Sequence, residues 1–314
     1  MTFIDALTRL QIEMLVEEPM SRHTSFRIGG PAEIMVMPKS TEEFLRVWEN
    51  CKQHEIPLTV LGDGTNVLVA DEGIRGVIVV TNKMNGIEKD GELIRAQAGA
   101  RLSKVAEVAC KAGLDGFAGA SGIPGTVGGA VFMNAGAYDY CTSDFCQHVS
   151  LLVEDSQGLA IVVKSAEEME FGYRKSIIQQ GQSRMFVLDA TFKLTPGDPA
   201  AIRAKMHELN TKRRNSQPLE FPSAGSAFKR PEGHYAGALI RNSGLKGFTI
   251  GGAQVSEKHA GFIINTGGAT AKDVLDLVEA VRQKVFADAG VWLEPEIRVL
   301  GDMEGNYVCS KGNL

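Results

Sequence analysis

Hydrophobic residues with helical spacing mark one buried helix face near the start of the chain. Phe44, Val47, Trp48 and Cys51 recur at positions i, i+3, i+4 and i+7. They follow the capping-box pattern Ser40-Thr41-Glu42-Glu43. The pattern predicts an amphipathic helix that begins near residue 41 and has ended by Pro57.

A second helical pattern lies near the other end of the chain. Thr270-x-x-Asp273 resembles a helix start, and Gly290 is a stop signal. The apolar positions between them, which share one helix face, are Val274, Leu277, Val278, Val281 and Val285. This spacing predicts a long amphipathic helix.

Two further helices are predicted from their end signals. Ser103 opens a short helix that Gly113 closes at its C′ position. Asp198 caps a helix that has Pro199 in its first turn and runs to about Lys212. Because Pro196-Gly197-Asp198 reads as a break, we expect a domain boundary there, with the second helix as the link between domains.

Short aliphatic and β-branched runs predict strands between these helices. The runs cover residues 58–60, 76–80, 149–154, 159–164, 185–194 and 296–300. The three runs between 149 and 194 follow one another with turns between them, which predicts a meander. Helices and strands together predict an α+β fold with at least two domains, and 314 residues are more than one ordinary domain holds.

Composition and charge exclude several classes of protein. With 44% hydrophobic residues the chain has enough apolar side chains for a sizeable core, and a net charge of −5 argues against a general nucleic-acid binder. The first residues lack the features of a signal peptide, and no run is long and apolar enough for a membrane span. Five scattered cysteines suit a reducing compartment, so we expect a cytoplasmic protein. Cys141 and Cys146 are expected to be ordinary thiols rather than zinc ligands.

Two glycine-rich segments are the strongest candidates for ligand binding. Leu61–Asn66 follows a predicted strand but lacks the P-loop lysine and the third glycine of the dinucleotide fingerprint. Its glycines allow a backbone nest for phosphate, although a plain tight turn also fits. Gly119–Ala137 combines glycine with apolar residues, which disordered linkers lack. It predicts ordered backbone close to a flat apolar ligand, or else tight backbone-on-backbone packing.

The order of motifs along residues 20–300 resembles the UDP-N-acetylenolpyruvoylglucosamine reductase family, flavin-dependent enzymes of cell-wall precursor synthesis. The matching segments are residues 23–32 (HTSFRIGGPA), 61–69 (LGDGTNVLV), 122–130 (GIPGTVGGA), 134–137 (NAGA), 171–176 (FGYRKS), 222–231 (PSAGSAFKRP) and 293–298 (LEPEIR). Each motif alone is moderately specific, and their order makes the resemblance strong.

The resemblance implies a fold in three parts. Residues 1–197 would form an FAD-binding module of the vanillyl-alcohol-oxidase-like type, with subdomains of about 1–82 and 83–197. Residues 198–314 would form an α+β substrate-binding domain whose last strand returns to the FAD module. The stretch between Arg174 and Ser226 is too short for the tyrosine-bearing loop of the family's longer members, so the chain resembles the shorter, second type. Arg230 stands where those longer members have Asn.

The family reaction implies catalytic roles for three residues. NADPH reduces FAD, a hydride passes to C3 of an enolpyruvyl ether, and C2 is then protonated. Ser226 matches the proton donor, and Arg174 and Glu296 match the groups that polarise the substrate carboxylate. Glu296 would act in its protonated form, with its pKa raised by burial. Without the resemblance, the favoured explanations are structural: a turn serine for Ser226, a surface ion pair for Arg174 and a salt bridge with Arg298 for Glu296.

The resemblance also implies the remaining site residues, and it implies no metal. The expected FAD-binding residues are Gly62, Asp63, Gly64, Thr65, Asn66, Ser121, Gly122, Ile123, Pro124, Gly125, Thr126, Gly128, Gly129, Ala130, Asn134, Ala135 and Arg214. The expected substrate-binding residues are Tyr173, Lys229 and Arg230. Two alternatives are another FAD-dependent oxidoreductase of the same superfamily and a non-catalytic sensor of a UDP-sugar or flavin. The Ser226 and Glu296 motifs argue against the first, whose members have different C-terminal domains, and intact Arg174, Ser226 and Glu296 argue against the second.

Overall fold

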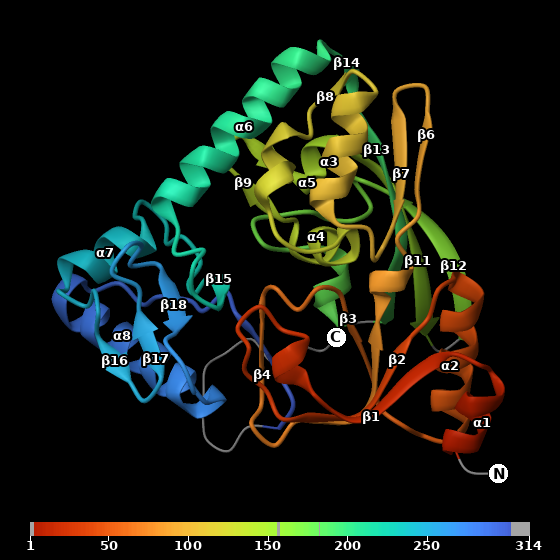
Figure 1. Ribbon diagram of the computed structural model, residues 1–314, viewed down its shortest axis with the longest axis horizontal. Helices are drawn as coiled ribbons and strands as arrows, with labels where there is room; N and C mark the ends of the chain where they lie inside the picture. The colour runs from red at the N-terminus through yellow and green to blue at the C-terminus, as the bar shows by residue number, and fades with distance from the viewer. Residues whose placement is uncertain (1–2, 156–157, 182, 303–314) are drawn as a thin grey trace.

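The computed structural model describes residues 3–155, 158–181 and 183–302, and it arranges them in two lobes (Figure 1). The larger lobe contains a four-stranded and a five-stranded sheet with three short two-stranded ones, and the smaller lobe, formed after a long helix, contains one four-stranded sheet. Each lobe combines helices with a sheet in which antiparallel pairs are present, which confirms the α+β prediction. None of the described helices is long and apolar enough to cross a membrane.

The first sheet of the larger lobe has the strand order β1-β2-β5-β3. β1 pairs antiparallel with β2, whereas β2, β5 and β3 are parallel. Helix α2 packs against this sheet with the predicted apolar face buried, and the Ser40 hydroxyl accepts a hydrogen bond from the Glu43 N–H. The elements are α1 (Phe3–Arg9), β1 (Glu13–Pro19), β2 (Pro31–Met37), α2 (Thr41–Gln53), β3 (Leu58–Leu61) and β5 (Ile74–Val80).

The second sheet has the order β12-β11-β13-β7-β6, so the predicted meander is wrong. β13 pairs with β11 on the side away from β12. The reason lies in burial: β13 is buried continuously from Phe186 to Phe192, which requires a central position, whereas β12 exposes Ile161 and Val163 as an edge strand. The strands are β6 (Ile87–Asp90), β7 (Leu93–Gln97), β11 (Cys146–Asp155), β12 (Gly158–Ser165) and β13 (Arg184–Lys193).

Helix α3 (Leu102–Lys111) begins one residue earlier than its sequence signal. Its N-cap is Arg101 rather than Ser103, because the Leu102 N–H donates to the carbonyl of Gly125 in the second glycine segment. The start of the helix is thus set by a tertiary contact that the local sequence does not contain. Its end is as predicted, with Gly113 at a φ of +65°.

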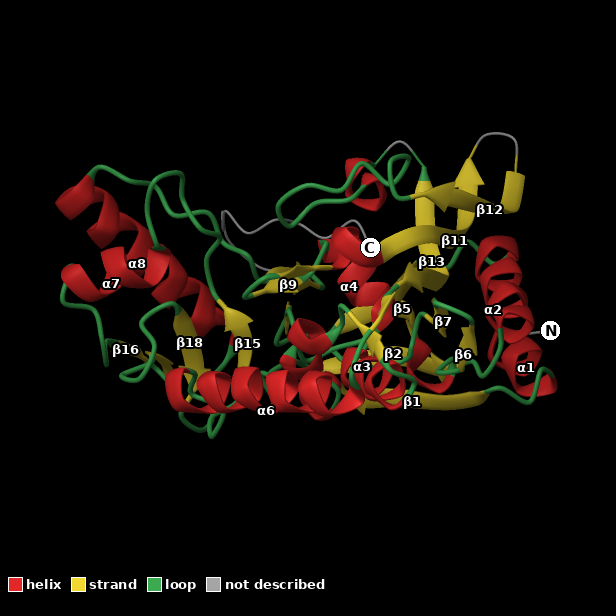
Figure 2. Cartoon of the chain, turned by 90° about the horizontal axis from the view of Figure 1, so that it is seen from above, coloured by secondary structure: helices red, strands yellow, loops and turns green. Residues whose placement is uncertain are grey.

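The long helix α6 (Pro199–Ser216) runs along one side of the molecule to the smaller lobe (Figure 2). The Asp198 carboxylate accepts hydrogen bonds from the N–H groups of Ala200 and Ala201, which confirms the predicted cap. The helix ends one turn later than predicted. Ile202 and Met206 pack into the core of the larger lobe.

The smaller lobe contains one antiparallel sheet with the order β15-β18-β17-β16. Helix α8 covers it with the predicted apolar stripe, its start fixed by the Thr270–Asp273 capping box and its end by Gly290 at a φ of +69°. The elements are β15 (Ser223–Ser226), α7 (Ala236–Asn242), β16 (Thr249–Ile250), β17 (Ala253–Val255), β18 (Phe262–Asn265) and α8 (Ala271–Ala289).

After α8 the chain returns to the larger lobe. Strand β19 (Arg298–Leu300) pairs in parallel with β4 (Val67–Val69), directly after the first glycine segment. β19 is shorter than the predicted strand because the Glu296 N–H bonds to the Ala227 carbonyl instead of joining β4. The remaining short elements are η1 (Met20–Arg22), η2 (Thr81–Lys83), β8 (Leu114–Asp115), η3 (Ala118–Gly122), α4 (Val127–Met133), β9 (Gly136–Ala137), β10 (Tyr140–Cys141), α5 (Thr142–Phe145), η4 (Ile177–Gln180) and β14 (Thr195–Pro196).

Candidate active site

A cavity of about 2030 Å³ is lined by residues of both lobes. Both glycine segments, the end of β15 and the residues just before β19 contribute to its wall. Pockets for one small ligand usually measure about 300–1,000 Å³. The cavity therefore has room for a large cofactor together with a second ligand.

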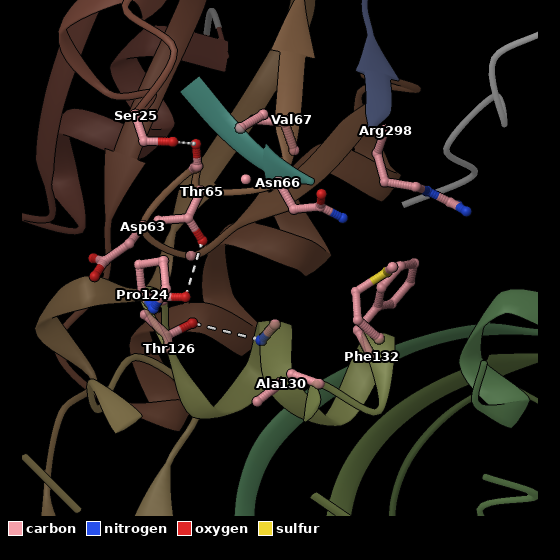
Figure 3. Close-up of a pocket in the computed structure, with 18 of the residues that line it drawn as sticks. Ser25, Asp63, Thr65, Asn66, Val67, Pro124, Thr126, Ala130, Phe132 and Arg298 are labelled. Carbon is pink, nitrogen blue, oxygen red and sulfur yellow. Dashed lines mark hydrogen bonds between the residues drawn. The ribbon is translucent and has the colours of Figure 1, made fainter. Parts of the chain in front are cut away.

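The first glycine segment forms a tight turn at the end of β3. Gly64 has a φ of +61°, and a Cβ there would lie 2.2 Å from the His23 carbonyl oxygen. A Cβ on Gly62 would lie 2.3 Å from the Thr126 Oγ1. Thr65 donates from its hydroxyl to the Pro124 carbonyl at 3.3 Å, so the two glycine segments touch each other at the cavity wall (Figure 3).

The second glycine segment combines the two arrangements that its sequence suggested, which are tight backbone packing and bare backbone facing a ligand site. A Cβ on Gly128 would lie 3.2 Å from Ala98, so this glycine permits close packing. A Cβ on Gly129 would meet only the Thr126 Oγ1, at 3.8 Å, so its open side faces the cavity that it lines. Thr126 caps α4 by accepting from the Gly129 N–H (Figure 3). Because Gly129 has no side chain, the cavity extends to its backbone, and a larger residue at this position would fill that space.

Arg174 and Glu296 form a largely buried ion pair at the cavity wall. The Arg174 Nε lies 2.5 Å from the Glu296 Oε1, and the two side chains are 19% and 11% exposed. Burial raises the pKa of Glu296 above its ordinary value, although Arg174 and Lys229 act in the opposite direction. The Arg174 Nη2 also donates to the Gly136 carbonyl at 3.3 Å. The partner of Glu296 is thus Arg174, and the salt bridge to Arg298 considered from the sequence does not form.

Ser226 ends β15 beside the segment that carries Glu296. The Glu296 N–H donates to the carbonyl of Ala227, the residue after Ser226, at 2.9 Å. On the other side, Asn66 donates from its side chain to the Glu296 carbonyl at 3.3 Å. None of the described residues hydrogen-bonds to the Ser226 hydroxyl, and Ser226 lines the cavity. Arg174, Glu296 and Ser226 therefore meet at one wall, next to the first glycine segment.

Several of the expected site residues lie away from the cavity wall. Asn134 holds the backbone of Gly172 and Ser143, and Ser121 bonds to Ala118 and Asn210. Arg214 donates to Thr211 on its own helix. These positions give the residues structural contacts in place of direct access to the cavity.

The three expected substrate residues lie where the lobes touch. The Tyr173 hydroxyl accepts a hydrogen bond from the Arg230 N–H at 3.0 Å, and the Arg230 guanidinium stacks over Tyr235 at 4.0 Å. The Lys229 Nζ pairs with Glu294 at 2.5 Å. None of the three is among the residues that line the cavity.

Two arginines at the cavity wall were missed from the sequence. Arg213 and Arg298 each have a buried Nε without a hydrogen-bond partner among the described residues. Burial lowers the pKa of both guanidinium groups. Arg298 comes from β19 and lies over the Phe132 ring (Figure 3). A sequence signal for Arg298 was present, because it belongs to the motif at residues 293–298. Arg213 is next to Arg214, which was predicted to bind FAD, and the two differ only in the face of the helix that they occupy.

The donors at the wall suit an anionic, partly aromatic ligand better than a metal. Among the described residues no group of three or more His, Cys, Asp and Glu side chains could hold a metal ion. Cys141 and Cys146 are free thiols, as are Cys51 and Cys110, while Cys309 lies outside the described residues. A bare glycine wall and two partly buried guanidinium groups, which have no acidic partner among the described residues, fit a phosphorylated cofactor with a flat ring.

Comparison with known proteins agrees with this chemistry. Residues 32–160 match the FAD binding domain family, and residues 217–300 match the family described as UDP-N-acetylenolpyruvoylglucosamine reductase, C-terminal domain. The chain is thus an FAD-binding oxidoreductase in which a second domain completes the cavity.

Similar proteins define the family more narrowly. The chain is 49% identical over 290 residues to the UDP-N-acetylenolpyruvoylglucosamine reductase of Caldanaerobacter subterraneus, which covers 92% of this chain and 94% of that protein. It is 48% identical to the reductase of Pediococcus pentosaceus, covering 93% and 96%. The crystal structure of the Thermus caldophilus enzyme superimposes with a TM-score of 0.77 at 35% identity, covering 92% and 98%. The chain belongs to the UDP-N-acetylenolpyruvoylglucosamine reductase family.

Proposed function

We propose that this chain reduces UDP-N-acetylglucosamine enolpyruvate to UDP-N-acetylmuramate with electrons from NADPH, as a step of peptidoglycan precursor synthesis. The observation that carries the proposal is the meeting of Arg174, Glu296 and the end of β15 at a cavity that both glycine segments line. Bound FAD supplies the hydride carrier between NADPH and the substrate. The protein supplies position, charge and a proton.

The two glycine segments are the proposed FAD site. Gly62–Asn66 and the backbone from Gly122 to Ala130 line the cavity, with Gly129 open toward it. Arg213 lies against Gly122, since a Cβ there would come within 3.0 Å of its Nε. It therefore joins the proposed cofactor residues, whereas Ser121, Asn134 and Arg214 would act from behind the wall.

Arg174 and Glu296 are proposed to bind the substrate carboxylate together. The guanidinium is always charged and offers several donors, so it can hold Glu296 and a second carboxylate at once. A substrate carboxylate brings a second negative charge close to Glu296, which favours the protonated form further. A protonated Glu296 then donates a hydrogen bond to that carboxylate where an ionised one would repel it.

Ser226 is proposed to protonate C2. A serine hydroxyl is a weak acid, but the enolate that develops after hydride arrives at C3 is a strong base. The hydroxyl lines the cavity and has no other hydrogen-bond partner among the described residues. It is therefore available to the substrate without breaking a contact of the fold.

The contact between the lobes is the proposed substrate entrance. The hydrogen bond between Tyr173 and Arg230 joins the lobes beside the cavity, where a sugar diphosphate would pass, and Lys229 lies next to it, paired with Glu294. Between Arg174 and α6 the described chain forms η4, β13 and β14 only, which supports the shorter, second type of the family. The division into residues 1–197 and 198–314 and a cytoplasmic location stay predictions.

An anaerobic absorbance experiment tests the proposed reaction. The purified protein is expected to show a flavin band that bleaches with NADPH and recovers when the enolpyruvyl UDP-sugar is added. A protein that takes up no FAD would overturn the proposal. Bleaching without recovery would identify a flavoenzyme with a different acceptor.

A further inference from the structure

The turn that carries Arg174 has an unusual backbone. Gly172 and Lys175 close it with two hydrogen bonds between their backbones, of 3.0 and 3.2 Å. Arg174 has a φ of +55°, in the left-handed region, which costs a residue with a side chain about 1–2 kcal/mol. The surrounding structure must therefore hold Arg174 in this conformation.

The side chain of Gln179 provides such a hold from η4. Its Nε2 donates to the Arg174 carbonyl at 3.2 Å and to the Phe132 carbonyl at 2.6 Å. Its Oε1 accepts from the Arg298 Nη1 at 3.5 Å. One amide thus contacts the backbone of the Arg174 turn, the end of α4 and the second buried guanidinium of this wall.

The same end of α4 holds the Arg174 turn through two more side chains. The Ser176 hydroxyl donates to the Phe132 carbonyl at 2.8 Å, and Asn134 donates to the Gly172 carbonyl at 3.0 Å. The first turn of α4 carries Gly129 at the proposed cofactor wall. Helix α4 therefore fixes the distance between Arg174 and the proposed cofactor wall, and the hydrogen bonds of Gln179 add to this connection.

We propose that Gln179 is a positioning residue, which fixes Arg174 and Arg298 relative to the end of α4 so that the substrate carboxylate is held at the right place. The inference deepens the proposed function and rests on it. A neutral amide is the side chain that suits this place, because it donates to two carbonyls and accepts from a guanidinium with the same group. A glutamate would turn a carboxylate toward the two carbonyls and lose both donated bonds.

Two substitutions test the role, with a matched control on the same element. Gln179→Met keeps the length and removes all three hydrogen bonds, and Gln179→Glu keeps only the acceptor. The control is Gln180→Met, because Gln180 is exposed and bonds to Glu170 at 2.6 Å, away from the cavity. Misplacing a substrate-binding group by about 1 Å costs on the order of 10²-fold in rate.

We expect both Gln179 variants to retain FAD and to be reduced by NADPH at a rate within about twofold of the unmodified protein. Reoxidation by the enolpyruvyl UDP-sugar should be slower by about 10- to 100-fold. Gln180→Met should leave both half-reactions unchanged. In an Arg174→Lys background, Gln179→Met should add little further loss, because both changes act on the same contact.

Three outcomes would overturn this role. Equal slowing of both half-reactions would make Gln179 a general support of the fold, as would loss of FAD in both variants. Full multiplication of the losses in the double variant would show that Gln179 acts independently of Arg174. Failure of the proposed function itself is distinguishable, since the unmodified protein would then not be reoxidised by the sugar.

Discussion

Arg174 and Glu296, 122 positions apart in the chain, are joined by a contact of 2.5 Å between Nε and Oε1. Arg174 comes from the larger lobe, and Glu296 comes from the segment that leads back from the smaller one. The pair is buried, and burial keeps the pKa of Glu296 above its ordinary value even beside a cation. Such a carboxyl group changes its charge readily when a third charged group arrives.

Ser226→Ala should separate the two half-reactions. Reduction of the flavin by NADPH is expected to stay near normal, while reoxidation by the enolpyruvyl UDP-sugar falls by about 10²-fold or more, because the proton donor is gone. Anaerobic stopped-flow absorbance measures both steps. Ser226→Cys, which keeps an acidic proton, is expected to retain part of the second step. Equal loss in both steps would contradict the role of Ser226 as proton donor.

Glu296→Gln should abolish turnover with the sugar and leave FAD bound. The amide has nearly the shape of the protonated acid, but as a neutral acceptor it holds Arg174 less tightly than a carboxylate, so the guanidinium is no longer fixed for the substrate carboxylate. The flavin absorbance per protein and the steady-state rate with NADPH and sugar are the two measurements. Loss of FAD from the purified variant would instead make Glu296 part of the cofactor site.

The raised pKa of Glu296 also predicts a pH dependence of stability. The unfolded chain releases this proton near the ordinary pKa of about 4.3, and the folded chain releases it at higher pH. Between these two pKa values the folded state binds more protons, so the free energy of unfolding falls as pH rises. The melting temperature of the unmodified protein should therefore drop relative to Glu296→Gln as pH rises through this interval. A difference that grows in favour of the unmodified protein would show that the ion pair with Arg174 dominates.

Substitutions at Gly129 should separate folding from cofactor binding. A methyl group there meets little, and alanine favours a helix over glycine by about 0.5–1 kcal/mol, so Gly129→Ala should slightly stabilise the FAD-free protein. Gly129→Leu should weaken FAD binding by about tenfold or more, the equivalent of ~1.4 kcal/mol, because its side chain extends into the cavity. Melting curves and flavin titrations measure the two effects. Unchanged affinity in Gly129→Leu would place FAD elsewhere on the wall.

Arg213 and Arg214 offer a direct comparison between neighbouring arginines. Arg213 lines the cavity with a buried Nε, and Arg214 faces away and bonds to Thr211. Arg213→Met is expected to weaken FAD binding by about 10- to 100-fold, the worth of a charged hydrogen bond. Arg214→Met should change it little. The reverse order in flavin titrations would favour the residue chosen from the sequence.

The helices and their ends were predictable because local residues determine them. Ser40, Asp198 and Thr270 cap their helices as the sequence indicated, and Gly290 ends α8. The start of α3 was not predictable from Ser103, because the Gly125 carbonyl that receives the Leu102 N–H lies in another segment.

The arrangement of strands and the identity of the pocket arginines needed the fold. The apolar run that became β13 fits either an edge strand or a central strand of a sheet. Only the burial of both its faces in the folded protein shows that it is central, beside β11. Arg213 and Arg214 are equivalent in sequence, and the packing of α6 alone decides which of them reaches the cavity. Gln179 carries no signal at all, since its partners are two backbone carbonyls and a distant guanidinium.

The parallel pairing of β19 with β4 has a consequence for how the protein is made on the ribosome. Val67–Val69 is synthesised early, but its neighbour Arg298–Leu300 emerges more than two hundred residues later. Contacts so distant in sequence form slowly. The larger lobe therefore cannot complete its folding until the smaller lobe has been translated, because β4 lacks its partner strand β19 before then. Glu296 and Arg298 arrive with that last strand, so the site becomes complete in the same step that closes the fold.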